Sequence, residues 1–134
     1  MAKKLNLTAA RRMIAAAKKK AEEINVPMVI AVVDDGGNLI AMERMDDALL
    51  VSLDLAKGKA YTAVALKMPT ATLAPLAQPG APLFGIDKTD GGRIVIFGGG
   101  IPVKNGDQII GGIGVSGGSV EEDIACSQAG LDAF

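Results

Sequence analysis

The chain has 134 residues and a net charge of −1, which indicates one domain of ordinary size and argues against a general nucleic-acid-binding protein. It contains one cysteine and no histidine, so an internal disulfide is excluded and the commonest general base and metal ligand is absent. We expect a single domain over residues 1–134, located in the cytoplasm, because the sequence shows neither a secretory signal nor an apolar run of membrane length.

The first third of the chain predicts a helix followed by a β-hairpin. Apolar residues recur at helical spacing over residues 8–25, with Thr8 as the expected N-cap and Pro27 as the stop. The apolar runs at 28–33 and 39–42, separated by turn residues, predict the hairpin. We interpret the many lysines and arginines of the helix as a solvated face rather than a site for an anionic partner.

The middle of the chain predicts helices, a loop and a third strand. An alanine-rich apolar stripe predicts a second helix at 50–67, followed by a short helix at 70–76. Several prolines and glycines then indicate an ordered loop at 78–86. Residues 90–92 read as a turn, and the apolar run at 93–97 predicts a strand.

The last third is dominated by the segment 97–118, which holds nine of the seventeen glycines. An Asn-Gly pair between the apolar runs 101–103 and 109–115 predicts another β-hairpin. Ser119 is the expected N-cap of a final helix. Two interpretations of the glycines stay open: close approach of the backbone to a ligand or a second subunit, or the bulges and turns of a small twisted sheet.

In chain order the expected elements are α-β-β-α-(α)-β-β-β-α. Directly connected hairpins imply an antiparallel sheet, here of five strands, and the helices place the chain in the α+β class.

The residues before the last helix are candidates for an anion-binding site. The backbone amides of Gly117, Gly118 and Ser119, together with the Ser116 hydroxyl, are placed to bind a carboxylate or another anion. Alternatively, the acidic side chains of residues 121–123 occupy this helix start themselves, and the sequence does not separate the two readings.

Three charged residues are further candidates. Arg44 and Asp46 follow the second strand, and Lys59 lies on the expected second helix. In the functional reading, Lys59 or Arg44 holds a ligand carboxylate. In the alternative reading, the lysines of this helix simply extend into water.

Several short motifs, in a fixed order, resemble the GlcG/HbpS-like family, also called the haem-degrading domain family. The motifs are RMDDA at 44–48, KGKAYTA at 57–63, FGI at 84–86, GGGIPV at 98–103, and GDQIIGGIGVSGG at 106–118 with Asp123. The family also includes the C-terminal domain of the corrinoid adenosyltransferase proteins of propanediol utilisation. The resemblance covers nearly the whole chain and implies a profilin-like fold with a five-stranded antiparallel sheet and flanking helices.

The resemblance also implies homo-oligomers, from dimers to octamers, with haem binding in some members and lyase activity on a small aromatic acid in at least one. The candidate catalytic residues are Asp46, Lys59, Glu121 and Asp123. The candidate ligand-binding residues are Arg44, Tyr61, Phe84, Gly98, Gly99, Gly100, Ser116, Gly117 and Gly118. Family members often have Pro-Gly-Gly where this chain has three glycines at 98–100.

Because the chain has no histidine, haem would need another axial ligand, and the cofactor stays unassigned at this point. The remaining candidates for that ligand are Tyr61, Thr62, Cys126, a methionine or a lysine.

Three functions stay open. The first is an accessory protein that binds haem or a corrinoid-like ligand at a subunit interface, with contacts from residues 44–61 and 98–123. The second is a cofactor-free, lyase-like enzyme for a small aromatic or hydroxy carboxylic acid, with a basic anchor and a carboxylate as acid or base. The third is a structural homo-oligomer without a ligand.

Overall fold

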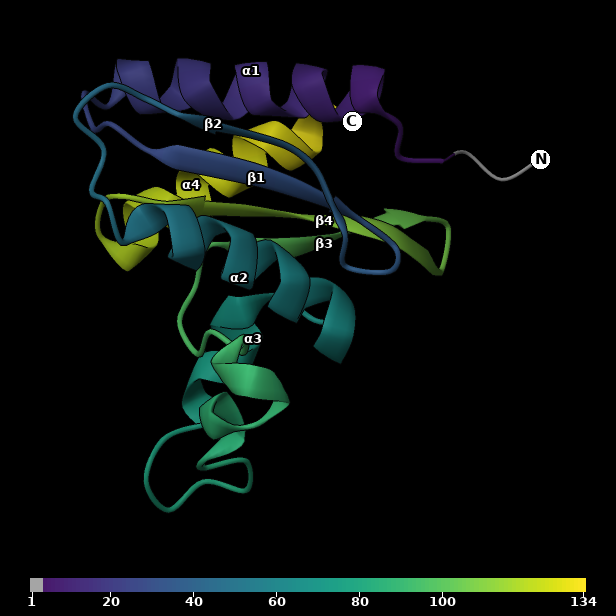
Figure 1. Cartoon of the computed structure of the whole chain (residues 1–134), viewed down its shortest axis with the longest axis vertical. Coiled ribbons are helices and arrows are strands. Elements are labelled where there is room, and N and C mark those ends of the chain that lie inside the picture. Colours follow the sequence, from purple (N-terminus) through teal and green to yellow (C-terminus); the bar gives the residue numbers. More distant parts are fainter. Residues whose placement is uncertain (1–3) are drawn as a thin grey trace.

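The computed structural model of the protein describes residues 4–134 (Figure 1). The helices and strands are α1 (Leu7–Glu23), β1 (Val29–Asp34), β2 (Leu39–Arg44), α2 (Ser52–Leu66), α3 (Thr70–Leu76), β3 (Gly100–Asn105), β4 (Gln108–Ser116) and α4 (Val120–Asp132). Two short 3₁₀ turns, η1 (Ile86–Lys88) and η2 (Asp90–Gly92), lie between α3 and β3. The α+β class expected from the sequence is confirmed.

The sheet separates two helical layers (Figure 1). Helices α1 and α4 pack against each other on one face, where Met13, Ile14 and Ile113 are buried in the main core. Helix α2 covers the opposite face and contacts β1, β3 and β4. Burial on both faces explains why β1 reads as a continuous apolar run from Val29 to Val33.

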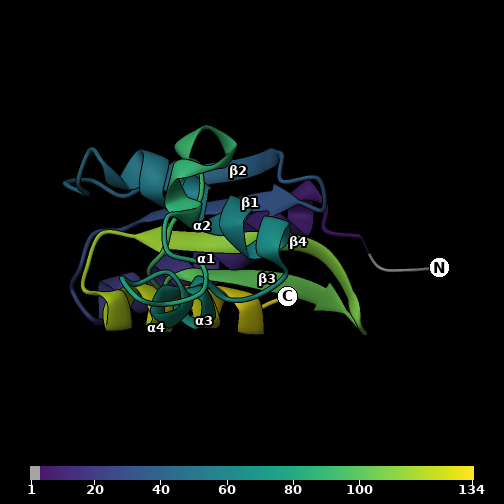
Figure 2. The same ribbon diagram turned by 90° about the horizontal axis from the view of Figure 1, so that it is seen from below.

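The sheet has the strand order β2-β1-β4-β3, and all neighbouring strands are antiparallel (Figure 2). Within residues 4–134 it has four strands, so the prediction of five was wrong. The missing strand is the one expected at 93–97. Val95 donates its backbone N–H to the Thr62 hydroxyl of α2 at 3.0 Å, and Ile94 is buried. The apolar pattern of this segment therefore reflects burial beside α2 and not pairing within the sheet.

Two helix starts show how local side chains set the boundaries. Asn6, and not Thr8, caps α1, because its side-chain oxygen accepts the Ala9 N–H at 2.9 Å. Ser119 caps α4 as expected, and it forms a capping box with Glu122. In that box the Glu122 carboxylate accepts the Ser119 N–H at 2.8 Å.

The glycines of β3 and β4 allow α2 to lie unusually close to the sheet. A Cβ atom at Gly114 would overlap the carbonyl oxygen of Ala56, and one at Gly112 would lie 2.7 Å from that of Ala60. A Cβ at Gly100 would meet the backbone of Lys59. At these three glycines the backbone approaches a helix of the same chain, rather than the ligand or second subunit that one interpretation expected, and this contact fixes the height of α2 above the sheet.

None of the helices between residues 4 and 134 is long and apolar enough to cross a lipid bilayer.

Candidate functional site

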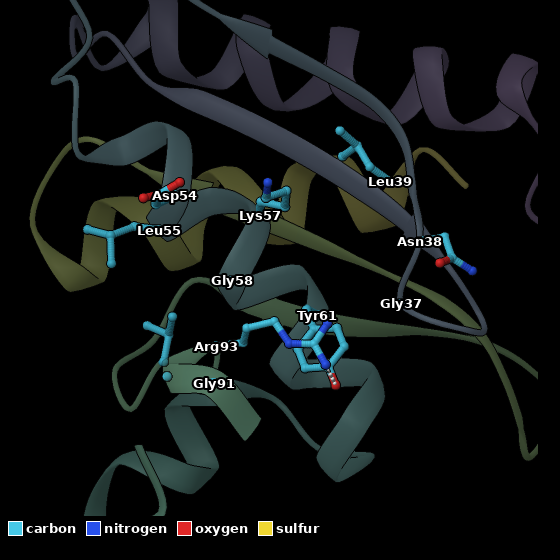
Figure 3. A pocket seen from close by; sticks show the side chains of 12 residues that line it. Gly37, Asn38, Leu39, Asp54, Leu55, Lys57, Gly58, Tyr61, Gly91 and Arg93 are labelled. Carbon is cyan, nitrogen blue, oxygen red and sulfur yellow. Dashed lines mark hydrogen bonds between the residues drawn. The ribbon is translucent and has the colours of Figure 1, made fainter. Parts of the chain in front are cut away.

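A cleft of about 620 Å³ runs along the outward side of α2, and we call it the α2 cleft (Figure 3). Its lining residues come from the β1–β2 turn, from α2 and from the segment after η1. They are Gly37, Asn38, Leu39, Asp54, Leu55, Lys57, Gly58, Tyr61, Gly91, Gly92, Arg93 and Val95. This volume is typical of small-molecule sites.

The β1–β2 turn that forms one wall is shaped by Asp34. Its carboxylate accepts the backbone N–H groups of Gly36 and Asn38, each at 2.9 Å. Gly37 has φ of 77° and lies against Tyr61, because a Cβ there would be 2.6 Å from Tyr61 Cδ1. A glycine is therefore required at this point of the cleft wall.

Tyr61, Asp90 and Arg93 form a hydrogen-bonded cluster at the cleft. The Tyr61 hydroxyl donates to the Asp90 carboxylate and accepts from Arg93 Nη2 at 2.9 Å. Arg93 Nη2 also donates to Asp90 Oδ1 at 2.7 Å, and its guanidinium carbon lies 4.0 Å from the centre of the Tyr61 ring. Figure 3 shows these side chains of Tyr61 and Arg93 beside each other.

The cluster fixes the charge of its members near neutral pH. The hydrogen bond to Asp90 raises the pKa of Tyr61, so the phenol keeps its proton. The hydrogen bonds from Arg93 and then Tyr61 lower the pKa of Asp90, so the carboxylate is charged. A neutral phenol between a carboxylate and a guanidinium results.

Two cationic side chains line the α2 cleft. Arg93 is engaged by Asp90, whereas Lys57 forms no ion pair with any residue of the described part of the chain. Lys57 is exposed and is therefore the cation in the cleft that is available to a ligand carboxylate.

Two predicted catalytic residues, Lys59 and Asp123, meet at 2.7 Å inside the protein. Lys59 is 0% exposed and also donates to the Val115 carbonyl at 3.0 Å, while Asp123 is 3% exposed and accepts the Gly118 N–H at 2.9 Å. The Phe97 ring lies over the amine, 5.0 Å from its centre. This pair connects α2 to α4 at the end of the sheet.

Burial governs the protonation of this pair. Desolvation lowers the pKa of Lys59 and raises that of Asp123, and the ion pair with its hydrogen bond opposes both shifts. Shifts of this kind also occur at catalytic groups. Neither residue lines the α2 cleft, however.

The other predicted catalytic and binding residues lie apart from the α2 cleft. Arg44 and Asp46 line a separate shallow groove of about 450 Å³, where Arg44 donates to the Ala48 carbonyl at 3.0 Å. Glu121 is exposed at the start of α4, and Phe84 is 65% exposed in the loop after α3. Among the predicted site residues, only Tyr61 lines the α2 cleft.

The glycines and serines around the start of α4 have partners of their own. Ser116 is buried and donates to the Ser52 hydroxyl at 3.0 Å. The N–H of Gly118 is bound by Asp123, and that of Ser119 by Glu122. This arrangement supports the reading in which acidic side chains occupy the helix start. The glycines 98–100 are buried beside Lys59 and α4, and Gly117 lies against the backbone of Pro27.

Four residues of the site were not among the predicted catalytic or binding residues: Gly37, Lys57, Asp90 and Arg93. Two of them carried a usable signal, because Gly37 and Asp90 were assigned to turns, and polar turn residues often line binding sites. Arg93 carried no such signal, because it was assigned to the strand expected at 93–97.

Comparison with known proteins identifies the family. The sequence model of the family described as "Haem degrading protein HbpS-like" matches residues 5–132. An uncharacterised 15.0 kDa protein from the dhaT-dhaS intergenic region of Citrobacter freundii is 49% identical over 130 residues, which is 97% of this chain and 92% of that protein.

Two further relatives carry more specific names. The corrinoid adenosyltransferase PduO of Citrobacter freundii is 45% identical over 119 residues, which is 89% of this chain but 36% of PduO. A crystal structure of a PduOC:heme complex is 41% identical with a TM-score of 0.95, and the match covers 98% of this chain and 96% of that one. As its ordered motifs predicted, the chain belongs to the HbpS-like family.

Proposed function

We propose that this protein binds a planar, carboxylate-bearing tetrapyrrole of the haem class in the α2 cleft. The observation that carries the proposal is the Tyr61 phenol, which is held in an open cleft also lined by Lys57, a cation that forms no ion pair within residues 4–134. The similarity to a PduOC:heme complex supports the same ligand class.

The residues of the cleft fit such a ligand in three respects. The volume of the cleft, about 620 Å³, lies within the usual range of cofactor sites. Lys57 would hold a propionate, because an ammonium pairs with a carboxylate at a partly exposed site. Tyr61 would supply an oxygen ligand for the iron in the absence of histidine, since tyrosine holds haem iron in some proteins. When bound, haem would supply iron and redox chemistry, whereas the chain supplies orientation and charge.

The lyase-like alternative has less support from the geometry. Two of its proposed residues, the anchor Lys59 and the acid or base Asp123, are buried and form an ion pair with each other. A substrate would have to separate a buried ion pair before either group could act. A small carboxylic acid could instead bind in the α2 cleft, and an experiment must distinguish this alternative from haem binding.

Haemin titration followed by absorbance tests the proposal. We expect a saturable Soret change for the natural protein. Binding to Lys57→Glu should be about tenfold weaker, because the introduced glutamate would repel the haem propionate that Lys57 attracts. Lys88→Glu is the matched control, because this substitution makes the same charge change outside the cleft. The side chain of Lys88 is 83% exposed.

Two results would contradict the proposal. One is a haemin spectrum that the protein leaves unchanged. The other is equal weakening by Lys57→Glu and Lys88→Glu, which would indicate a general charge effect. Thermal stabilisation by benzoate or hydroxybenzoate, without a haemin response, would favour the small-acid alternative, because a ligand of the native state raises the melting temperature.

We further propose that the protein self-associates through the segment 49–51. Leu49, Leu50 and Val51 precede α2 and are 58%, 72% and 58% exposed. Three consecutive apolar side chains in solvent are typical of an interaction surface. Light scattering would test this proposal. The natural protein should have the mass of an oligomer, and the variant Leu50→Asp should have a mass closer to that of one chain. A mass of 13.7 kDa for the natural protein would refute the proposal.

A further inference from the structure

Arg93 is held along one edge of its guanidinium, which leaves other donors of the group available to a ligand. Its Nη2 donates to Asp90 Oδ1 at 2.7 Å and to the Tyr61 hydroxyl at 2.9 Å, and its Nε donates to the Asp90 carbonyl at 3.4 Å. A guanidinium has five N–H donors. The two on Nη1 form no hydrogen bond with any residue from 4 to 134.

These contacts fix the direction in which the free donors point. The guanidinium carbon lies 4.0 Å from the centre of the Tyr61 ring, and the Tyr61 hydroxyl donates to the second oxygen of the Asp90 carboxylate. The Arg93 side chain is nevertheless 57% exposed. A donor that is oriented before binding loses less conformational entropy when it binds. A carboxylate that binds at Nη1 requires no change in the protonation or the hydrogen bonds of Tyr61.

Lys57 and Arg93 are neighbours in the α2 cleft. Lys57 and Tyr61 are four positions apart on α2, so they share a helix face with their Cβ atoms about 5–6 Å apart. Arg93 stacks on Tyr61, and all three residues line the cleft (Figure 3). Asp54, the acidic residue of the lining, lies one turn from Lys57 in the opposite direction along α2. The two cations are therefore grouped on one side, away from Asp54.

Resting on the proposed function, we infer that Arg93 is a second carboxylate anchor and that the α2 cleft selects a ligand with two carboxylates. Lys57 binds one carboxylate, and the Nη1 group of Arg93 binds the other. Haem and related porphyrins carry two propionates on one edge of the ring, so this edge would face the two cations. The apolar part of the ring would then lie against Leu39, Leu55 and Val95, which line the same cleft.

Mesoporphyrin without a metal tests this inference, because its fluorescence reports binding and no iron takes part. The comparison is between the porphyrin with two free propionates and its neutral diamide on the same ring. We expect the natural protein to bind the diacid about tenfold more tightly than the diamide. Arg93→Gln should weaken binding of the diacid about fivefold and change binding of the diamide less than about twofold. Lys88→Gln, which removes one positive charge outside the cleft, is the control.

A charge-matched variant separates a specific contact from a general charge effect. Combining Asp90→Asn with Arg93→Gln leaves the net charge of the protein unchanged, yet it should still bind the diacid about fivefold more weakly. Tyr61→Phe also keeps the net charge but removes one contact that orients Arg93. It should weaken binding of the diacid alone, about threefold, whereas a general loosening of the cleft would weaken the diacid and the diamide equally.

The outcomes separate this inference from the proposed function. If the natural protein binds neither haemin nor mesoporphyrin, the proposed function fails. If it binds haemin but not mesoporphyrin, or binds the diamide as tightly as the diacid, binding of haem stands and selection for two carboxylates is wrong. The assignment of Arg93 is wrong if the charge-matched variant keeps the natural affinity for the diacid, or if Arg93→Gln and Lys88→Gln weaken it equally. Circular dichroism confirms that each variant is folded.

Discussion

Replacing Lys59 by methionine tests the buried ion pair that connects α2 to α4. The change keeps the length of the side chain but removes the charge. It leaves the Val115 carbonyl without its donor and the Asp123 carboxylate with the Gly118 N–H as its remaining partner. Breaking a buried pair from one side costs about 3–5 kcal/mol, a large part of the roughly 5–15 kcal/mol that stabilises a domain.

Urea unfolding at pH 5 and pH 8 measures this loss and its dependence on pH. Without Lys59, desolvation of Asp123 is unopposed by an ion pair, so its folded-state pKa lies above the unfolded value of about 4. The folded state then binds more protons than the unfolded state, and stability falls as pH rises through this window. We therefore expect the Lys59→Met deficit to be smaller at pH 5 than at pH 8.

Two controls make the result specific. Lys57→Met changes an exposed lysine of the same helix and should alter stability by about 0.5 kcal/mol or less. Adding Asp123→Asn to Lys59→Met removes the orphaned charge while leaving an oxygen for Gly118, so it should recover most of the loss. A Lys59→Met deficit below about 1 kcal/mol, or one that is the same at both pH values, would refute the reasoning.

Two further predictions concern the fold. Asn6→Ala should cost about 1 kcal/mol in urea unfolding, because Asn6 caps α1, whereas Thr8→Ala should cost much less; equal effects would contradict the cap assignment. Gly114→Ala should cost about 3 kcal/mol or more, since its methyl group would meet the backbone of Ala56, while Gly85→Ala faces open space and should cost about 1–2 kcal/mol for its positive φ.

Local patterns in the sequence were enough to predict most of the elements. Apolar periodicity located the helices, and turn residues located both hairpins. The strand expected at 93–97 did not form, because an apolar run indicates burial but not the element against which it is buried. Val95 pairs with a threonine side chain of α2 instead of a neighbouring strand, and nothing in its own segment signals that partner.

The site was less accessible from sequence because its contacts are long-range. Lys59 and Asp123 were both selected, but 64 positions separate them and no pattern indicated that they pair inside the protein. Tyr61 is likewise 29 positions from Asp90 and 32 from Arg93. Positive φ values at Asp90, Gly91 and Gly92 shape the turn that brings these side chains together, and sequence alone predicts a turn without its direction.

The most direct test of the central claim is to locate the ligand on the protein. Amide chemical shifts of the isotope-labelled protein would be followed during titration with gallium protoporphyrin, a diamagnetic analogue of ferric haem. The account predicts that the largest changes fall on the residues that line the α2 cleft, which come from the segments 37–39, 54–61 and 91–95. Changes centred instead on the groove at Arg44 and Asp46, or on the start of α4, would contradict it.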